Sequence, residues 1–160
     1  MTIDARDMGL FEPLYTFVSD EGENINIASA RLRAWTNDKA NGIETVLVPC
    51  RREVAEKFIA EGSVSPEHCA QLARQVYDEG LELWPVLLAL YGNVPIEEDL
   101  TQDVICVDGH HTTLLFAMSG AKEMPVQFIT RAQWEPFRVI GLRDISQSAL
   151  RAMPIMKVVR

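Results

Sequence analysis

Residues 104–113 read Val-Ile-Cys-Val-Asp-Gly-His-His-Thr-Thr, and this stretch decides the expected fold. Its first four residues are apolar and predict a buried strand, and the run from Leu114 to Met118 predicts a helix. Gly109 lies between them, so a glycine turn joins a strand to a helix. Such a turn directs backbone N–H groups and the positive end of a helix towards one point, which favours an anion and above all a phosphate.

The polar side chains of this turn are candidates for catalysis and binding. They belong to Asp108, His110, His111, Thr112 and Thr113. The two histidines titrate near neutral pH and are suited to proton transfer, while Asp108 is suited to orienting one of them or to holding a metal ion. The two hydroxyl groups are suited to donating to a ligand or to capping the helix. The alternative is structural: one histidine donates to a backbone carbonyl and the other is exposed.

We expect no metal site made by the protein alone. Asp108, His110, His111 and His68 lack the spaced ligand pairs of a zinc site. A hydrated Mg²⁺ shared with the phosphates of a nucleotide needs only one or two carboxylates. The acidic run at 97–99 either supplies one of them or is a solvated loop.

Strands alternate with helices on both sides of the motif. Apolar runs predict strands at 43–49, 83–91, 104–107 and 126–130, and periodic patterns predict helices at 28–35, 51–60, 66–79 and 114–118. The alternation predicts an α+β (mixed α/β) domain. Residues 1–43 are expected to form a largely irregular extension that packs on this domain. Residues 131–160 are expected to form a basic helical tail.

Length and composition limit the class of protein. With 160 residues, 48% of them hydrophobic and 24% charged, the chain fits one globular domain. Three widely spaced cysteines exclude a disulfide framework and favour a reducing, cytoplasmic compartment. No apolar run reaches the roughly 18 residues of a membrane span, and the first residues lack a signal-peptide core.

The net charge of -8 is unevenly distributed. Residues 1–129 carry -12, whereas residues 130–160 carry +4. An acidic body repels phosphate at long range, so DNA contacts are expected to be weak, non-specific and sensitive to salt, through Arg51, Arg52 or the tail. The tail either has a partner of its own or is a solvated basic helix.

The segment ICVDGHHTTLLFAMSGAKEMPVQFI, residues 105–129, resembles the phosphate-loop segment of the ParB/sulfiredoxin superfamily. In that superfamily an apolar strand enters a polar turn, a helix follows, and a glycine, an acidic residue and a proline lead into the next strand. Upstream, ETVLVP resembles its first strand, SVSPEHCAQLARQVYDEG its central helix and LELWPVLLALY the strand after that helix. The resemblance covers residues 44–130 and implies a ParB/sulfiredoxin-like domain there, a small mixed sheet flanked by helices. Several ParB-like proteins use the Asp-Gly-His-His form of the turn.

The resemblance implies a site for ATP or another nucleotide with Mg²⁺. The residues that would bind the phosphates are Gly109, His110, His111, Thr112, Thr113, Arg51 and Arg52. Arg74 or Gln75 of the central helix would line the same pocket. The alternative for Arg51 and Arg52 is that they neutralise Glu53 and Glu56 along their own helix.

Two departures from the superfamily pattern limit what the resemblance implies. Sulfiredoxins carry a nucleophilic cysteine where this chain has His110, so sulfinic-acid reduction is excluded, and Cys106 is expected to be a core thiol. Many relatives have an arginine where this chain has Thr112, so Arg51 or Arg52 would have to supply that charge. Roughly 40 residues follow the motif, too few for the DNA reader and dimerisation domain of a partitioning ParB, so we expect a stand-alone module.

The resemblance therefore implies an ATPase or DNase with Asp108, His110 and His111 as catalytic residues. Small relatives, including the Osa-like fertility-inhibition proteins of conjugative plasmids, imply nucleotide hydrolysis and DNA cleavage. They also imply action against the transfer of another plasmid through a type IV secretion system. Because Thr112 replaces the usual arginine, the alternative is a catalytically inactive binding protein that blocks a secretion or DNA-transfer partner.

Overall fold

The computed structural model describes residues 2–9, 12–19, 21–61, 64–92 and 104–141. The helices are α1 (Ser29–Asn37), α2 (Arg52–Glu61), α3 (Pro66–Glu79), α4 (His110–Met118) and α5 (Arg131–Trp134), with short 3-10 turns at Ala5–Asp7, Lys39–Asn41 and Glu135–Phe137. The strands are β1 (Ile3–Asp4), β2 (Leu14–Val18), β3 (Asn24–Ala28), β4 (Val46–Pro49), β5 (Val86–Leu90), β6 (Val104–Asp108), β7 (Glu123–Ile129) and β8 (Val139–Ile140). The chain is an α+β protein, as the sequence predicts.

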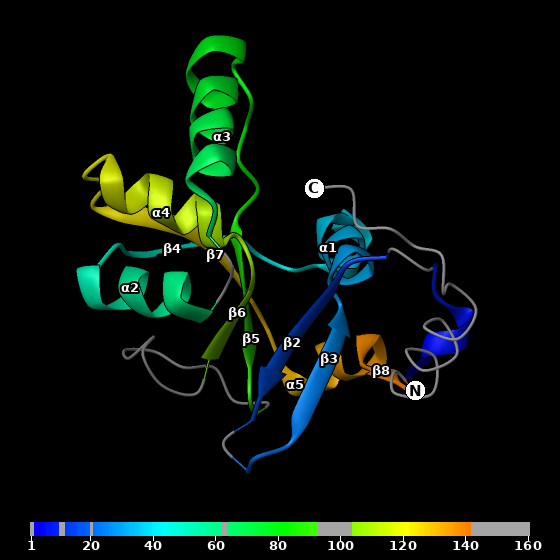
Figure 1. The fold of residues 1–160 in the computed structure, drawn as a ribbon. Coiled ribbons are helices and arrows are strands. Elements are labelled where there is room, and N and C mark those ends of the chain that lie inside the picture. Colours follow the sequence, from blue (N-terminus) through cyan, green and yellow to red (C-terminus); the bar gives the residue numbers. More distant parts are fainter. Residues whose placement is uncertain (1, 10–11, 20, 62–63, 93–103, 142–160) are drawn as a thin grey trace.

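A four-stranded mixed sheet in the order β4-β7-β5-β6 forms the centre of the fold (Figure 1). The inner strands β5 and β7 are parallel, and each outer strand is antiparallel to its neighbour. All five residues of β5 are buried, as expected for a strand covered on both faces. The predicted small mixed sheet is therefore confirmed.

The two faces of this sheet carry separate apolar clusters. Along β5, Leu87 and Ala89 pack with Ile25 and Trp134, whereas the intervening Leu88 packs on the α2 side. Helix α5 is fixed in the first cluster because the Trp134 indole Nε1 donates to the Leu90 carbonyl at 2.8 Å. The alternation of side chains along a strand thus places α1, α5 and the β2–β3 hairpin on one face and α2 and α4 on the other.

The N-terminal region is more regular than the sequence analysis predicts. Strands β2 and β3 form an antiparallel hairpin with Tyr15 opposite Ile27 and Phe17 opposite Ile25. Phe17 and the two isoleucines belong to the same apolar cluster as Leu87 of the central sheet. The expectation of an irregular segment is wrong because burial of one face of the hairpin stabilises it. The described part of the predicted polar turn, residues 21–23, lies between the two strands.

Helix α3 follows its local signals. The Ser65 hydroxyl accepts from the His68 N–H, Pro66 occupies the first turn, and Gly80 ends the helix at φ 70°. Figure 1 shows this helix projecting from the body, with its start beside α4. No helix within the described ranges is long and apolar enough to cross a membrane. The acidic run at 97–99 and residues 142–160 of the expected basic tail lie outside the described residues, whereas residues 131–141 form α5, a 3-10 turn and β8.

Candidate functional site

The site is organised by the sharp change of direction between β6 and α4. Gly109 has φ 105° and ψ 23°, a left-handed conformation that side chains rarely adopt. A Cβ atom at this position would lie 3.1 Å from the Val86 Cα, so any other residue here would require β5 to shift by a few tenths of an ångström. Helix α4 begins at His110, earlier than the apolar run alone predicts, which places both histidines and both threonines in its first turn.

The first turn of α4 has no side-chain cap. Backbone N–H groups in a helix's first turn lack partners within the helix, so those of His110, His111 and Thr112 point towards the space before α4. Thr113 does not extend this set, because its Oγ1 donates to the Gly109 carbonyl at 2.9 Å and its N–H to the same oxygen at 2.8 Å. Its hydroxyl stabilises the turn. Thr112 is also largely buried, at 8% exposure, and lines the space before the helix.

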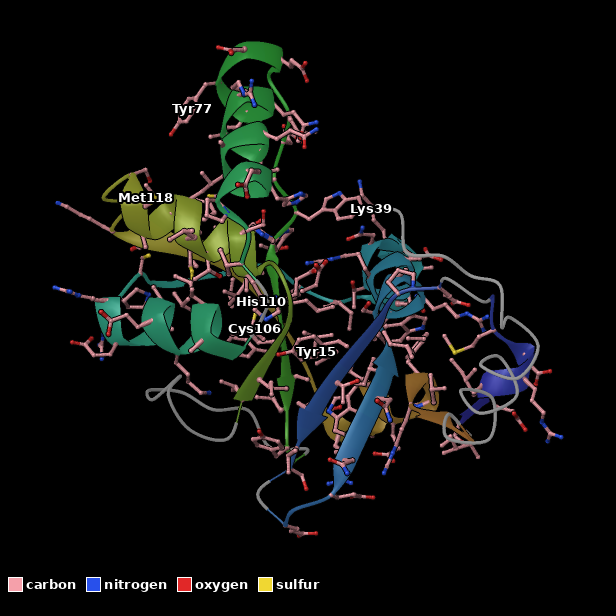
Figure 2. All side chains as sticks on the ribbon, viewed as in Figure 1. Tyr15, Lys39, Tyr77, Cys106, His110 and Met118 are labelled. Atoms are coloured by element: carbon pink, nitrogen blue, oxygen red, sulfur yellow. The ribbon has the colours of Figure 1, made fainter. Side chains whose placement is uncertain are left out.

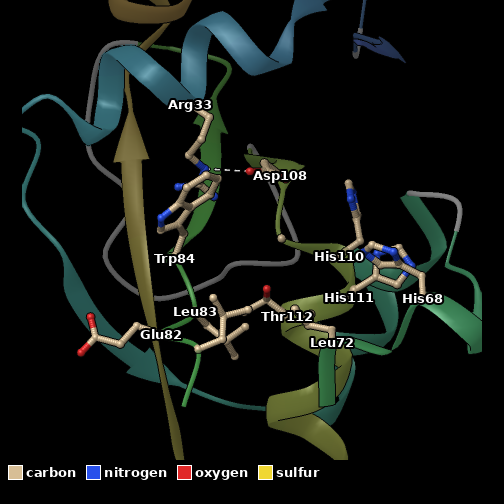
Figure 3. A pocket seen from close by; sticks show the side chains of 12 residues that line it. Arg33, His68, Leu72, Glu82, Leu83, Trp84, Asp108, His110, His111 and Thr112 are labelled. Atoms are coloured by element: carbon tan, nitrogen blue, oxygen red, sulfur yellow. Dashed lines mark hydrogen bonds and ion pairs between the residues drawn. The ribbon is translucent and has the colours of Figure 1, made fainter. Parts of the chain in front are cut away.

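A cavity of about 390 Å³ opens before this helix start, and we call it the α4 cavity (Figure 3). Its lining comes from the α1, β6–α4 and α3–β5 regions: Arg33, His68, Leu72, Leu81, Glu82, Leu83, Trp84, Asp108, Gly109, His110, His111 and Thr112. The structure therefore brings five of the residues chosen from the sequence, those from Asp108 to Thr112, to one cavity.

Asp108 is held by a residue that the sequence analysis did not select. The Arg33 Nε donates to the Asp108 Oδ2 at 2.7 Å, and its other nitrogens donate to the Pro85 carbonyl at 2.7 Å and to the Gln127 Oε1 at 3.4 Å. Arg33 is only 4% exposed, whereas the side chain of Asp108 is 43% exposed. The carboxylate thus orients no histidine by a hydrogen bond. Arg33 neutralises the carboxylate on one side, and the exposed part of the carboxylate faces the α4 cavity.

A β-bulge explains how Asp108 reaches α1. Asp108 pairs with Leu87, and Cys106 pairs with the adjacent Leu88, so β6 has one extra residue at this point. Strict alternation would place the side chain of Asp108 on the same face as that of Cys106. The bulge instead lets it meet Arg33 of α1, on the opposite face. Cys106 itself is fully buried, which confirms the expected core thiol.

His110 is largely buried beside Tyr15, with 5.3 Å between the ring centroids (Figure 2). Its Nε2 is a buried atom with no hydrogen-bond partner among the described residues. Burial lowers the pKa of His110 below its ordinary value, although the Asp108 charge and a hydrogen bond to the Cys106 backbone act in the opposite direction. His110 is therefore neutral at pH 7, with a lone pair at Nε2.

His111 has a structural partner. Its Nε2 accepts from the Ser65 backbone N–H at 3.0 Å, and its ring lies 4.3 Å from that of His68. Burial, followed by the repulsion of His68, lowers the pKa of His111. The lone pair of Nε2 is thus engaged in holding the start of α3 against α4. Of the two histidines, only His110 has an unengaged ring nitrogen that is buried.

The structure separates Arg51 and Arg52 from the α4 cavity. They line a different hollow between α2 and the far end of α4, together with Cys50 and Met118. The Arg52 Nε pairs with the Glu56 Oε1 at 2.8 Å, the intrahelical alternative. The expectation that either arginine supplies the charge missing at Thr112 is therefore wrong.

The central helix also contributes different residues from those expected. Its His68 and Leu72 line the α4 cavity, whereas Arg74 and Gln75 do not. These two positions lie further along α3 than Leu72.

The cavity fits a phosphate ester better than a metal held by the protein alone. No group of three or more metal-ligating side chains occurs within the described ranges. Asp108 offers one carboxylate beside an uncapped helix start, and one or two carboxylates suffice for a Mg²⁺ that phosphates also ligate. The chain matches no protein-family model, no curated protein and no solved structure, so the residues of the site carry the functional argument.

Proposed function

We propose that the protein binds a nucleoside phosphate such as ATP with Mg²⁺ at the start of α4, and hydrolyses it. The observation that carries this proposal is the uncapped first turn of α4, which opens into the α4 cavity that His110 also lines. The resemblance of residues 44–130 to the ParB/sulfiredoxin superfamily supports the same chemistry. We also propose that residues 44–130 adopt a ParB/sulfiredoxin-like fold.

Binding would use the backbone more than side chains. Phosphate oxygens accept from the N–H groups of His110, His111 and Thr112, and the helix dipole favours their negative charge. Gly109 supplies the left-handed backbone conformation that starts α4 at this point and so places these N–H groups together. Arg33 cancels the charge of Asp108, which would otherwise repel the ligand.

Asp108 is the residue suited to holding Mg²⁺, through the carboxylate oxygen that Arg33 does not bind. The metal ion would neutralise charge on the phosphates.

Proton transfer is assigned to His110. A water that attacks the terminal phosphorus must lose a proton as the new P–O bond forms and the bond to the leaving phosphate breaks. His110 lines the α4 cavity, and its Nε2, buried in this structure, is suited to take that proton once the side chain turns towards the cavity, because its lone pair is unengaged and its lowered pKa favours the neutral ring at pH 7. Because His111 already accepts from Ser65, its role would be to position the helix start.

A second candidate is binding without turnover. Among the residues that the structure describes, Arg33 is the only arginine or lysine lining the α4 cavity, and its hydrogen bonds go to Asp108, Pro85 and Gln127. Phosphoryl transfer ordinarily uses a cation that stabilises the developing charge. This shortage favours a protein that binds the nucleotide and blocks a secretion or DNA-transfer partner.

For either candidate, the proposed biological role is inhibition of conjugative DNA transfer through a type IV secretion system. Cleavage of DNA is a further proposed activity. The net charge of -8 makes any DNA contact local, weak and strongly dependent on salt.

The test compares the wild type with His110→Gln and with Glu53→Gln, an exposed change on α2 that controls for handling. Release of phosphate from Mg-ATP and binding of Mg-ATP by calorimetry are measured for each. We expect turnover to fall about 100-fold or more in His110→Gln with little change in affinity, as for loss of a general base. Equal turnover in all three proteins would refute the assignment of His110. Binding without turnover in the wild type would establish the second candidate.

A further inference from the structure

A second cavity adjoins the α4 cavity, and we call it the α1 cavity. It measures about 520 Å³ and is lined by Pro13, Ser29, Ala30, Arg33, Ala34, Asn37, Trp84 and Asp108. Arg33, Trp84 and Asp108 line both cavities, so the two meet at the ion pair and the indole ring. A ligand with its phosphates before α4 can therefore extend past Trp84 into the α1 cavity.

Trp84 is an unusual surface residue. It precedes β5 and is 61% exposed, although burial of its large apolar ring would be favourable. The Arg33 guanidinium lies 5.7 Å from the ring centroid, so a fixed cation holds the indole in place (Figure 3). Because Arg33 is itself fixed by Asp108, Pro85 and Gln127, the ring is positioned before any ligand arrives.

The remaining walls suit a flat, uncharged ring. Pro13, Ala30 and Ala34 are small or apolar and leave room beside the indole. Asn37, at the end of α1, offers both a donor and an acceptor at the edge of the cavity. An aromatic face with one amide at the rim is the arrangement that proteins use to stack a nucleobase and to bind its edge.

We propose that the α1 cavity is the base subsite of the nucleotide site, with Trp84 as its stacking platform and Asn37 as a contact to the base edge. The inference rests on the proposed function, because it assumes phosphates at the start of α4. It commits to a free nucleotide as the occupant. A single strand would bring many more phosphates to a chain of net charge -8.

The test measures the affinities of Mg-ATP, adenosine, tripolyphosphate and a short oligo(dA) for four proteins. These are the wild type, Trp84→Ala, Trp84→Phe and Tyr77→Ala. Tyr77 is a matched control because it is an aromatic residue with 73% exposure that lines neither cavity (Figure 2). We expect Trp84→Ala to bind ATP about tenfold more weakly, the usual effect of losing one base–aromatic stack, and tripolyphosphate as before. Trp84→Phe and Tyr77→Ala should bind ATP within about threefold of the wild type.

The other outcomes would overturn the base subsite or its occupant, and one of them would also overturn the proposed phosphate site. Unchanged ATP affinity in Trp84→Ala overturns the base subsite and leaves the proposed phosphate site standing. Equal losses for ATP and tripolyphosphate mean that Trp84 supports the phosphate site, which also overturns the inference. Tighter binding of oligo(dA) than of ATP would mean that the α1 cavity binds a base of a single strand and not of a free nucleotide, which overturns the proposed occupant. If neither ATP nor tripolyphosphate binds the wild type, the proposed function fails and the base subsite fails with it.

Discussion

Substitution of Arg33 by methionine removes the contact on which the geometry of the site depends. The guanidinium joins α1 to Asp108 at the end of β6, to the Pro85 carbonyl before β5 and to Gln127 of β7. Methionine has a similar length and keeps the apolar contacts of the arginine side-chain carbons. The substitution therefore removes mainly the hydrogen bonds and the ion pair of the guanidinium.

The magnitude follows from the burial of each partner. Loss of a buried hydrogen bond to a charged group costs about 1.5–3 kcal/mol, and an unsatisfied carbonyl adds about 1 kcal/mol or more. The Asp108 side chain is 43% exposed, so water solvates the carboxylate when Arg33 is removed. The loss of the Arg33–Asp108 hydrogen bond therefore contributes less to the cost than a fully buried one would. We expect Arg33→Met to lower the free energy of unfolding by about 3 kcal/mol. Asp108→Asn should lower it by about 1 kcal/mol, because the amide oxygen still accepts from Arg33.

The assay is urea unfolding of the wild type, Arg33→Met, Asp108→Asn and the double variant, read by tryptophan fluorescence and circular dichroism. The double variant should be more stable than the sum of the single losses predicts, by about 1 kcal/mol, because each single change already removes the charge–charge attraction between the two residues. A loss below about 0.5 kcal/mol in Arg33→Met, or strict additivity, would refute the assignment of Arg33 as the residue that organises the site.

Three further predictions concern the turn itself. Gly109→Ala should cost about 2 kcal/mol of unfolding free energy, measured in urea, because its φ of 105° is strained for alanine and its Cβ would crowd β5. His111→Ala should cost about 1–2 kcal/mol because it leaves the Ser65 N–H without its acceptor, whereas the exposed His68→Ala should cost less than about 0.5 kcal/mol in the same assay. The pKa of His110 is lowered in the folded protein, so the unfolded chain takes up a proton first, and stability should fall as the pH drops through about 6.5 and level off below the folded pKa. Urea unfolding between about pH 7.5 and about pH 5 should show a shallower fall in His110→Gln, and an unchanged profile would contradict the burial of this ring.

Local signals in the sequence predict much of this fold. The strand, the glycine and the helix at 104–118 follow from residues that are neighbours in the chain. Helix α3 follows from Ser65, Pro66 and Gly80. The hairpin of β2 and β3 is not predicted, although residues 24–27 alternate between polar and apolar as a strand does. Residues 14–18 of β2 show no such alternation, and this strand is stabilised by burial against the central sheet.

The site is less predictable because its key contacts are not local. Arg33 and Asp108 are 75 positions apart, and nothing in the helix pattern of 28–35 indicates that an arginine turns inward. Arg51 and Arg52 follow the first strand, yet Arg52 pairs with Glu56 along α2 and both arginines line a separate hollow. The side on which a helix presents its charges depends on how it packs, which spacing alone does not predict.

The central claim is that a nucleotide's phosphates bind at the uncapped start of α4. It is tested most directly by following the backbone amide resonances of the ¹⁵N-labelled protein during titration with Mg-ATP and with tripolyphosphate. The account predicts that both ligands produce their largest shifts at Gly109, His110, His111 and Thr112, and that Gly109→Ala abolishes these shifts. Shifts confined to the surroundings of Arg51 and Arg52, or no shifts with either ligand, would contradict it.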